Sequence, residues 1–152
     1  MGAIRPVPAA ALGRYAALLC ALDATDRRLR FGRPMDDEAI LDHVDGLARG
    51  GALVLGMWRG LALVGAVEVV RVGGCAEIAL VVAPSARRAG LGRALFERAL
   101  AGAPAVVVCL SILAENRPMR AMAARAGFGV VATGPELLLR RAPVGPAETV
   151  AA

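Results

Sequence analysis

The sequence predicts an α/β fold in which about four helices flank a mixed, mostly antiparallel sheet of about six to seven strands. Three observations support this prediction. Between residues 52 and 82, β-rich runs are joined by short glycine turns. A strongly apolar run, Ala105–Leu113, follows a segment with helical spacing. Segments in which apolar residues recur at helical spacing come before and after these runs, so helices and strands are both expected along the chain.

The first part of the chain is expected to hold one short strand and two helices. In order, these are a strand over Ala3–Val7, a helix over Ala9–Leu22, a charged connection over Asp23–Arg33 and a helix from about residue 36 to about Leu47. The acidic side chains of Asp36, Asp37 and Glu38 suit the positive end of a helix. Gly50 and Gly51 are expected to end this second helix.

Three strands are predicted next, at Ala52–Trp58, Leu61–Val72 and Cys75–Val82. Arg59-Gly60 and Gly73-Gly74 form the turns between them. Because turns this short join neighbouring strands in opposite directions, the three strands are expected to pair as an antiparallel meander.

The last part of the chain alternates helices and strands. The expected elements are a helix from about Leu91 to Ala101, a central strand over Ala105–Leu113, a helix over Pro118–Ala126 and a hairpin of Phe128–Thr133 with Leu137–Arg141. Asn116 fits the N-cap of the last helix, and Gly127 fits its C-cap. Residues 1–141 are therefore expected to form one domain, and residues 142–152 a flexible tail.

Composition narrows the classes of function. Apolar residues make up 57% of the chain, yet no run approaches the roughly 20 residues of a membrane helix, and no signal peptide is evident. One His and three well-separated Cys favour neither a metal site nor disulfides, which fits a cytoplasmic protein. The net charge is +5, but the Arg residues are dispersed and aromatic residues are only 3%, which argues against nucleic-acid binding.

The strongest functional signal is the stretch Ala76–Leu100, an apolar strand followed by a loop and an amphipathic helix. Gly90 and Gly92 of the loop allow a ligand to approach the backbone closely. Free N–H groups and a helix N-terminus then meet at one point, an arrangement suited to a pyrophosphate. The loop lacks the GK[ST] sequence of a Walker loop. A glycine-rich turn without a ligand is the alternative interpretation.

Two motifs and the element order extend this interpretation. The first motif is Val82-Ala83-Pro84 followed by Arg87, Gly90 and Gly92, and the second is Asn116-Arg117-Pro118-Met119 with Met122 and Gly127-Phe128. Through them the chain resembles the GNAT superfamily of acetyl-CoA-dependent N-acetyltransferases, whose fold has the same order of strands and helices. The resemblance spans most of the chain and implies a GNAT-like sheet and acetyl-CoA as the acyl donor, with no metal.

The resemblance also implies where acetyl-CoA binds. The pyrophosphate would lie on the loop, the pantetheine arm between the strands Cys75–Val82 and Ala105–Leu113, and the thioester carbonyl near a backbone N–H of residues 80–82. The cofactor-binding residues expected on this basis are Leu80, Val81, Val82, Arg87, Arg88, Ala89, Gly90, Leu91, Gly92, Arg93, Asn116 and Met119. An amine attacks the thioester directly in this family, so no covalent enzyme intermediate is needed.

Glu77 is the first candidate for the base that takes a proton from the amine. It is the only charge in an apolar strand and shares a face with Ala79 and Val81. The alternative is a solvent-facing residue without a role. Glu68, also within a strand, is the second candidate, and its alternative role is a cross-strand pair with an Arg.

The chain departs from the family pattern at the general acid. Many members have a Tyr at the position that aligns with Ala123, and the only Tyr of this chain, Tyr15, is expected to serve packing. Ser111, Asn116 or water could protonate the coenzyme A thiolate instead. We therefore name Ser111 as the second candidate catalytic residue, with an ordinary strand hydroxyl as the alternative.

The segment Arg27–Phe31 resembles the R-x-R-F stretch of a GNAT subgroup that includes bacterial protein lysine acetyltransferases. In the family this region borders the acceptor site, and the alternative is a solvated charged connection. His43 is expected to be a surface residue.

Three classes of function follow from these observations. The first is an active N-acetyltransferase for a primary amine, either a protein lysine or a small molecule. The second is a GNAT module that binds acyl-CoA with little or no catalysis, which the missing Tyr motivates. The third is a structural domain whose glycine-rich loop is only a turn. An apolar strand near the C-terminus makes a homodimer a candidate assembly.

Overall fold

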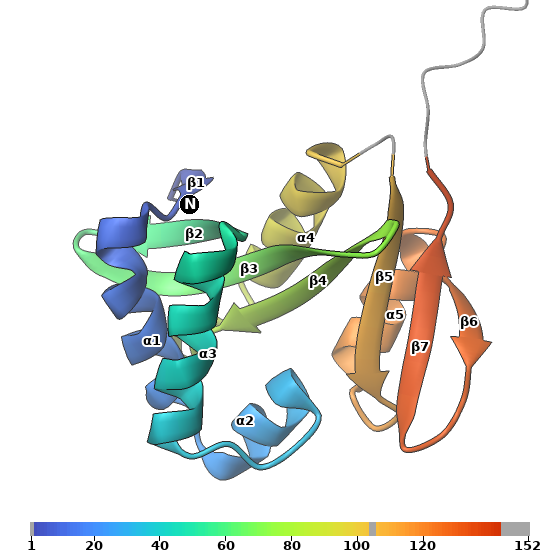
Figure 1. The fold of residues 1–152 in the computed structure, drawn as a ribbon, viewed down its shortest axis with the longest axis horizontal. Helices are drawn as coiled ribbons and strands as arrows, with labels where there is room; N and C mark the ends of the chain where they lie inside the picture. The colour runs from blue at the N-terminus through green and yellow to red at the C-terminus, as the bar shows by residue number, and fades with distance from the viewer. Residues whose placement is uncertain (1, 104–105, 144–152) are drawn as a thin grey trace, which may run out of the picture.

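The computed structural model describes residues 2–103 and 106–143. A seven-stranded sheet forms its centre, in the order β1-β2-β3-β4-β5-β7-β6 (Figure 1). The strands are β1 (Ile4–Pro6), β2 (Leu53–Arg59), β3 (Ala62–Val72), β4 (Cys75–Val82), β5 (Val107–Leu113), β6 (Gly129–Ala132) and β7 (Glu136–Arg141). The β4–β5 pair is parallel, and the other neighbours pair antiparallel. This confirms the predicted mixed, mostly antiparallel sheet.

Helices cover both faces of the sheet. They are α1 (Leu12–Cys20), α2 (Ala24–Phe31), α3 (Asp37–Gly50), α4 (Leu91–Ala101) and α5 (Arg117–Arg125). One apolar core joins α1 and α3 to β2 and β3 around Tyr15, Leu19 and Ile40. A second core joins α4 and α5 to the opposite face around Leu95 and Leu110. The part of the sheet formed by β2, β3 and β4 is therefore buried on both sides, whereas β5 contributes residues to the second core only.

Most predicted elements are confirmed within a few residues of their expected ends. The meander β2–β3–β4 pairs antiparallel through tight turns, and α4 spans Leu91–Ala101 as expected. Asn116 caps α5 by accepting a hydrogen bond from the N–H of Met119 at 3.4 Å. The predicted tail lies outside the described residues from position 144 on. In the described ranges, no helix is both long and apolar enough to cross a membrane.

The prediction of a charged connection over Asp23–Arg33 is wrong, because this segment forms α2. Asp23 caps the helix by accepting a hydrogen bond from the N–H of Asp26 at 2.8 Å. Gly32 ends it in the left-handed conformation, with φ of 75°. These two capping residues stabilise α2. The helix was not predicted because most of its residues are polar or charged. The missed helix matters because α2 lies beside the cavity described below.

The parallel pair β4–β5 is short. Pairing begins with Cys75 opposite Val107 and ends with Glu77 opposite Cys109. Within the described residues, no further residues of the two strands pair. Beyond Glu77 the strands diverge, and Figure 1 shows β4 running away from β5 toward α1 and α3. The divergence leaves one edge of β4 without a strand partner.

Candidate active site

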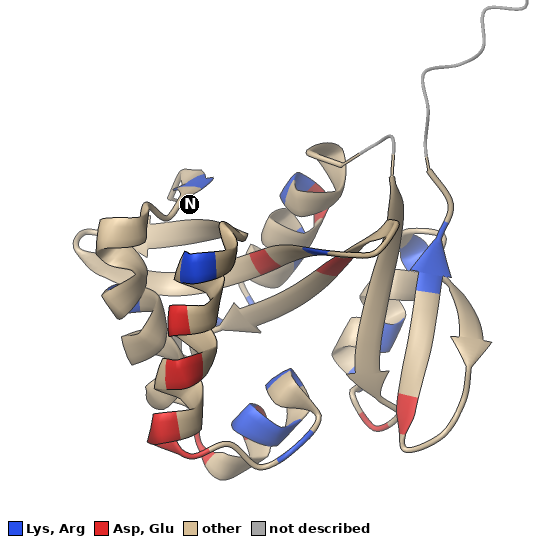
Figure 2. Ribbon diagram, viewed as in Figure 1, with Lys and Arg blue, Asp and Glu red and all other residues tan. Residues whose placement is uncertain are grey.

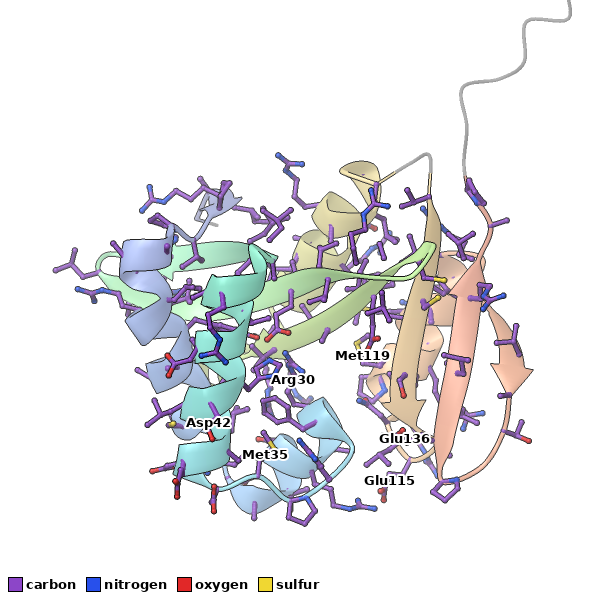
Figure 3. The ribbon with its side chains drawn as sticks, in the orientation of Figure 1. Arg30, Met35, Asp42, Glu115, Met119 and Glu136 are labelled. Carbon is purple, nitrogen blue, oxygen red and sulfur yellow. The ribbon has the colours of Figure 1, made fainter. Side chains whose placement is uncertain are left out.

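A cavity of about 1100 Å³ lies where β4 and β5 separate. Its walls come from α2, α3, β3, β4, the loop before α4 with the first residues of that helix, β5, α5 and β7. In Figure 3, Arg30 and Asp42 lie on one side of this space, and Met119 and Glu136 lie on the other. The cavity therefore brings together segments from almost the whole chain.

The loop before α4 forms one end of the cavity. Arg87, Arg88, Gly90, Leu91 and Gly92 line it. Gly90 is the N-cap residue of α4, has φ of 77° and provides no side chain to satisfy the first N–H groups of the helix. These N–H groups and the positive end of the helix dipole are oriented to receive an anion.

Gly92, in the first turn of α4, has no side chain that could fill the space beside the loop. A Cβ at this position would lie 3.6 Å from Val82 Cγ2 and 3.7 Å from Leu80 Cδ2, which is ordinary contact. Glycine here is therefore not required by packing against β4. Its effect is to leave room above the backbone for a ligand.

Arg87 links the loop to α2. Its guanidinium lies 3.0 Å from Asp26 Oδ2, and its Nε donates to the carbonyl of Val82 at 3.1 Å. Two predicted cofactor residues, Ala89 and Arg93, do not line the cavity, and Arg93 pairs with Glu97 at 2.7 Å instead. The loop thus offers Arg87 and Arg88 as its cavity-lining cations.

The free edge of β4 provides backbone donors. The N–H of Ala83 points toward β3, where it donates to the carbonyl of Val64 at 2.8 Å. Because N–H groups alternate in direction along a strand, those of Leu80 and Val82 point to the other side, from which β5 has moved away. Leu80, Val81 and Val82 all line the cavity. This edge can therefore hold an amide chain or a developing oxyanion.

Glu77 lies at the apex of the divergence, where β4 and β5 last pair. It is exposed and lines the cavity. Its register partners are Val70 on β3 and Cys109 on β5. Its side chain therefore projects from the face of the sheet that α2 and α3 cover, beside the free edge of β4.

Ser111, Asn116 and Met119 face the same cavity from the β5 side. Ser111 Oγ donates to Glu136 Oε2 at 3.2 Å. Ala123, at the position where many GNAT proteins have Tyr, is fully buried in the α5 core. The structure thus places the predicted catalytic residues Glu77 and Ser111, with Asn116, around one space.

Glu68 lies on the same face of the sheet but is only 3% exposed. Three donors contact its Oε1: Tyr15 Oη at 2.5 Å, an Arg30 guanidinium nitrogen at 2.6 Å and His43 Nε2 at 2.7 Å. Burial alone raises the pKa of Glu68, but the Arg30 charge and the hydrogen bonds from His43 and Tyr15 outweigh burial and hold the pKa below its ordinary value. Glu68 is therefore an ionised acceptor of hydrogen bonds.

Sequence reasoning missed this cluster. The prediction that His43 is a surface residue is wrong, because its side chain is only 29% exposed, bonds Glu68 and lines the cavity. Tyr15 is buried as expected but also donates a hydrogen bond. The Arg that pairs with Glu68 comes from α2 and not from a neighbouring strand. The signal was Glu68 itself, because a charge within an apolar strand requires buried partners.

Comparison with known proteins identifies the family. The model of the acetyltransferase (GNAT) family matches residues 18–128. The fold is similar to the GNAT domain of S. lividans PAT, with a TM-score of 0.75 and 18% identity over 91% of this chain and 88% of that one. It is also similar to an acyl-CoA N-acyltransferase from Pseudomonas aeruginosa, with a TM-score of 0.72 and 24% identity over 93% and 100%.

A third solved structure, the PaiA N-acetyltransferase from Thermoplasma acidophilum in complex with coenzyme A, has a TM-score of 0.67 and 15% identity over 93% of this chain and 99% of that one. A search of curated protein sequences finds no significant match. The family match covers well over half of the sequence and agrees with the fold, the loop and the divergent strands. The chain therefore belongs to the GNAT family of acetyltransferases.

Proposed function

We propose that this protein transfers the acetyl group of acetyl-CoA to the nitrogen of a primary amine by direct attack. One observation carries the proposal: an anion-binding loop, a free strand edge and a carboxylate line a single continuous cavity. These are the three groups that a thioester with a pyrophosphate and an amine would need. The similarity of the fold to that of the PaiA N-acetyltransferase, solved in complex with coenzyme A, supports the proposed use of acetyl-CoA.

The loop and β4 account for acetyl-CoA. The N–H groups at the start of α4, with Arg87 and Arg88, would bind the pyrophosphate. The pantetheine amides would pair with the free edge of β4 in place of a neighbouring strand. The N–H of Leu80 or Val82 would then donate to the thioester oxygen and stabilise the oxyanion that forms on attack.

Glu77 would accept the proton that the amine nitrogen loses as it bonds to the acetyl carbon. The thioester C–S bond then breaks, and coenzyme A leaves as a thiolate. Ser111 or Asn116, which face the cavity from β5 and the start of α5, would return a proton to the thiolate, directly or through water. No covalent bond to the enzyme forms in this sequence.

The walls on the acceptor side favour a cationic amine. Asp42 of α3, Glu77 of β4 and Glu136 of β7 line the cavity, and acidic segments on these elements are red in Figure 2. Leu29 and Phe31 of α2 add apolar surface to the cavity wall. Such a wall suits an ammonium group carried on an aliphatic stem, as in a lysine side chain or a small alkyl polyamine.

Thiol release from acetyl-CoA tests the proposal. The assay uses a panel of alkylamines, polyamines and lysine-containing peptides, with product mass confirming an N-acetyl group. Amine-dependent release of coenzyme A supports the proposal. Saturable acetyl-CoA binding without turnover on any amine would favour the second function, an acyl-CoA-binding module, which the buried Ala123 at the usual Tyr position motivates.

Two further proposals concern the setting of the protein. A cytoplasmic location is supported by three free thiols, Cys20, Cys75 and Cys109. A homodimer through the β6 edge stays a prediction, supported by the exposed Val130 and Val131. Light scattering of the purified chain checks the second.

A further inference from the structure

Tyr15, Arg30, His43 and Glu68 form a cluster, the Glu68 cluster, built around the Glu68 carboxylate. Glu68 accepts three hydrogen bonds on one oxygen, and two of the donors, Tyr15 and Arg30, are themselves buried. Arg30 also donates to the Tyr15 hydroxyl at 3.0 Å. Tyr15 and Arg30 therefore hold the Glu68 carboxylate in one orientation, with its charge balanced by Arg30.

Arg30, His43 and Glu68 all line the cavity, and His43 has the most exposed side chain of the three, at 29% against 7% for Arg30 and 4% for Glu68. The His43 Nε2 lies 2.7 Å from Glu68 Oε1, and the His43 ring meets Phe31 edge-on, with centroids 5.2 Å apart. The Arg30 guanidinium carbon lies over the Phe31 ring, 4.6 Å from its centroid. The imidazole therefore contacts Glu68 and Phe31, and Arg30 in turn contacts both of these residues.

The contact with Glu68 selects one tautomer of the neutral imidazole. Because an ionised carboxylate only accepts hydrogen bonds, Nε2 must carry the hydrogen, and Nδ1 then has a free electron pair. Nδ1 forms no hydrogen bond within the described part of the chain. A proton taken up at Nδ1 would leave the hydrogen bond from Nε2–H to Glu68 in place.

The groups around His43 include a carboxylate and the guanidinium that balances its charge. Glu68 faces it from β3, Arg30 and Phe31 from α2, and Tyr15 of α1 lies behind Glu68. Glu68 and Glu77 share one face of the sheet, two residues apart in the β3–β4 register. His43 and Glu77 both line the cavity, so a bound amine could meet both side chains.

We propose that His43 is a second proton acceptor, which removes the first proton from the ammonium form of the acceptor before Glu77 takes the second. The inference rests on the proposed acetyl transfer. At neutral pH a primary alkylamine enters as an ammonium ion and must lose two protons to become an amide nitrogen with one hydrogen.

The protons balance across the two groups. Transfer of one N–H proton to Nδ1 leaves a neutral amine with a free electron pair. The N–C bond then forms, the C–S bond breaks, and the remaining excess N–H proton passes to Glu77. One proton returns to the coenzyme A thiolate and the other leaves to solvent, so His43 and Glu77 begin the next cycle unprotonated.

The test compares two acceptors that differ in ammonium acidity. One is the best alkylamine of the panel, and the other is its β,β-difluoro counterpart, assayed above the pKa of its ammonium form. His43→Gln keeps an N–H donor toward Glu68 but removes the imidazole. We expect it to lower kcat/KM about a hundredfold for the alkylamine and less than about threefold for the fluorinated amine.

The controls separate this role from a structural one. Asp45→Asn changes an exposed residue of α3 outside the cavity and should leave both acceptors unaffected. Glu77→Gln should lower kcat/KM for both amines alike, because its proton leaves after attack. His43→Asn, a shorter amide, provides a second substitution if Gln at position 43 lowers the melting temperature.

An equal loss for both amines in the His43 variants, or no loss for the alkylamine, would overturn the inference while wild-type turnover still supports acetyl transfer. Failure of the wild-type protein to acetylate any amine would instead overturn the proposed function and, with it, this role for His43.

Discussion

Glu68 and Glu77 project from the same face of adjacent strands, two residues apart in register, yet one is buried under three donors and the other is exposed in the cavity. Opposite surroundings give the two carboxylates different chemistry. Glu68, ionised and fully partnered, orients His43. Glu77, free to meet substrate, can accept a proton at the point where β4 and β5 separate.

Replacing Glu77 with Gln tests its role as a base. We expect turnover to fall by about 10²-fold or more, because the attacking nitrogen loses its proton acceptor while the acetyl-CoA contacts stay. Steady-state kinetics and calorimetric titration with acetyl-CoA measure the two effects. Glu38→Gln, an exposed position on α3 outside the cavity, is the matched control. Unchanged turnover in Glu77→Gln would remove Glu77 from the mechanism.

Arg87→Gln should weaken binding of acetyl-CoA about tenfold, because a charge-assisted contact with the pyrophosphate is lost. The loss should be much smaller for S-acetylpantetheine, which lacks the pyrophosphate. Arg98→Gln, at the far end of α4 and outside the cavity, should bind acetyl-CoA as the wild type does. Equal weakening of both ligands would mean that Arg87 acts through loop structure and not through the phosphate.

Asp26→Asn is expected to have the opposite effect. Asp26 pairs with Arg87 at 3.0 Å in the structure, and an incoming pyrophosphate would compete with it for the same guanidinium. Removing the charge should therefore tighten acetyl-CoA binding about twofold to fivefold, within the small range of half-exposed ion pairs. Titration at low salt checks this, and weaker binding would show that the pair organises the loop for its ligand.

Glu68→Gln should destabilise the fold at neutral pH by about 3 kcal/mol, because it leaves Arg30 buried without its counterion. The folded pKa of Glu68 lies below the ordinary 4.5, so its stabilisation is complete above that pH and is lost as the pH falls through the folded pKa. The variant should therefore lose less stability than wild type between pH 5 and pH 3. Urea unfolding of both proteins at several pH values in this range measures the free energy of unfolding. The same pH dependence in both proteins would contradict this role of Glu68.

Much of the fold could be predicted from the sequence because local signals agree with tertiary packing. The meander β2–β3–β4, the helix α4 and the cap at Asn116 combine pattern, turn and capping residues that point to one structure. The Arg87–Gly92 loop was also evident, because its glycines and arginines are contiguous. The domain limit at residue 141 stays a prediction.

The Glu68 cluster could not be predicted, because its members come from four separate segments. Tyr15, Arg30, His43 and Glu68 lie on α1, α2, α3 and β3, and each alone fits packing or solvent exposure. Only the fold brings them onto one carboxylate. The helix α2 was missed for a related reason, since its arginines pair with carboxylates outside the helix, at Asp37, Glu68 and Glu115.

The most direct test of the central claim is the thermal shift caused by acetyl-CoA compared with S-acetylpantetheine. A cavity that holds the pyrophosphate on the loop before α4 should give a saturable rise of about 5 °C or more with acetyl-CoA, and little rise with the truncated thioester. No shift with acetyl-CoA, or the same shift with both compounds, would contradict the assignment of this cavity to the acyl donor.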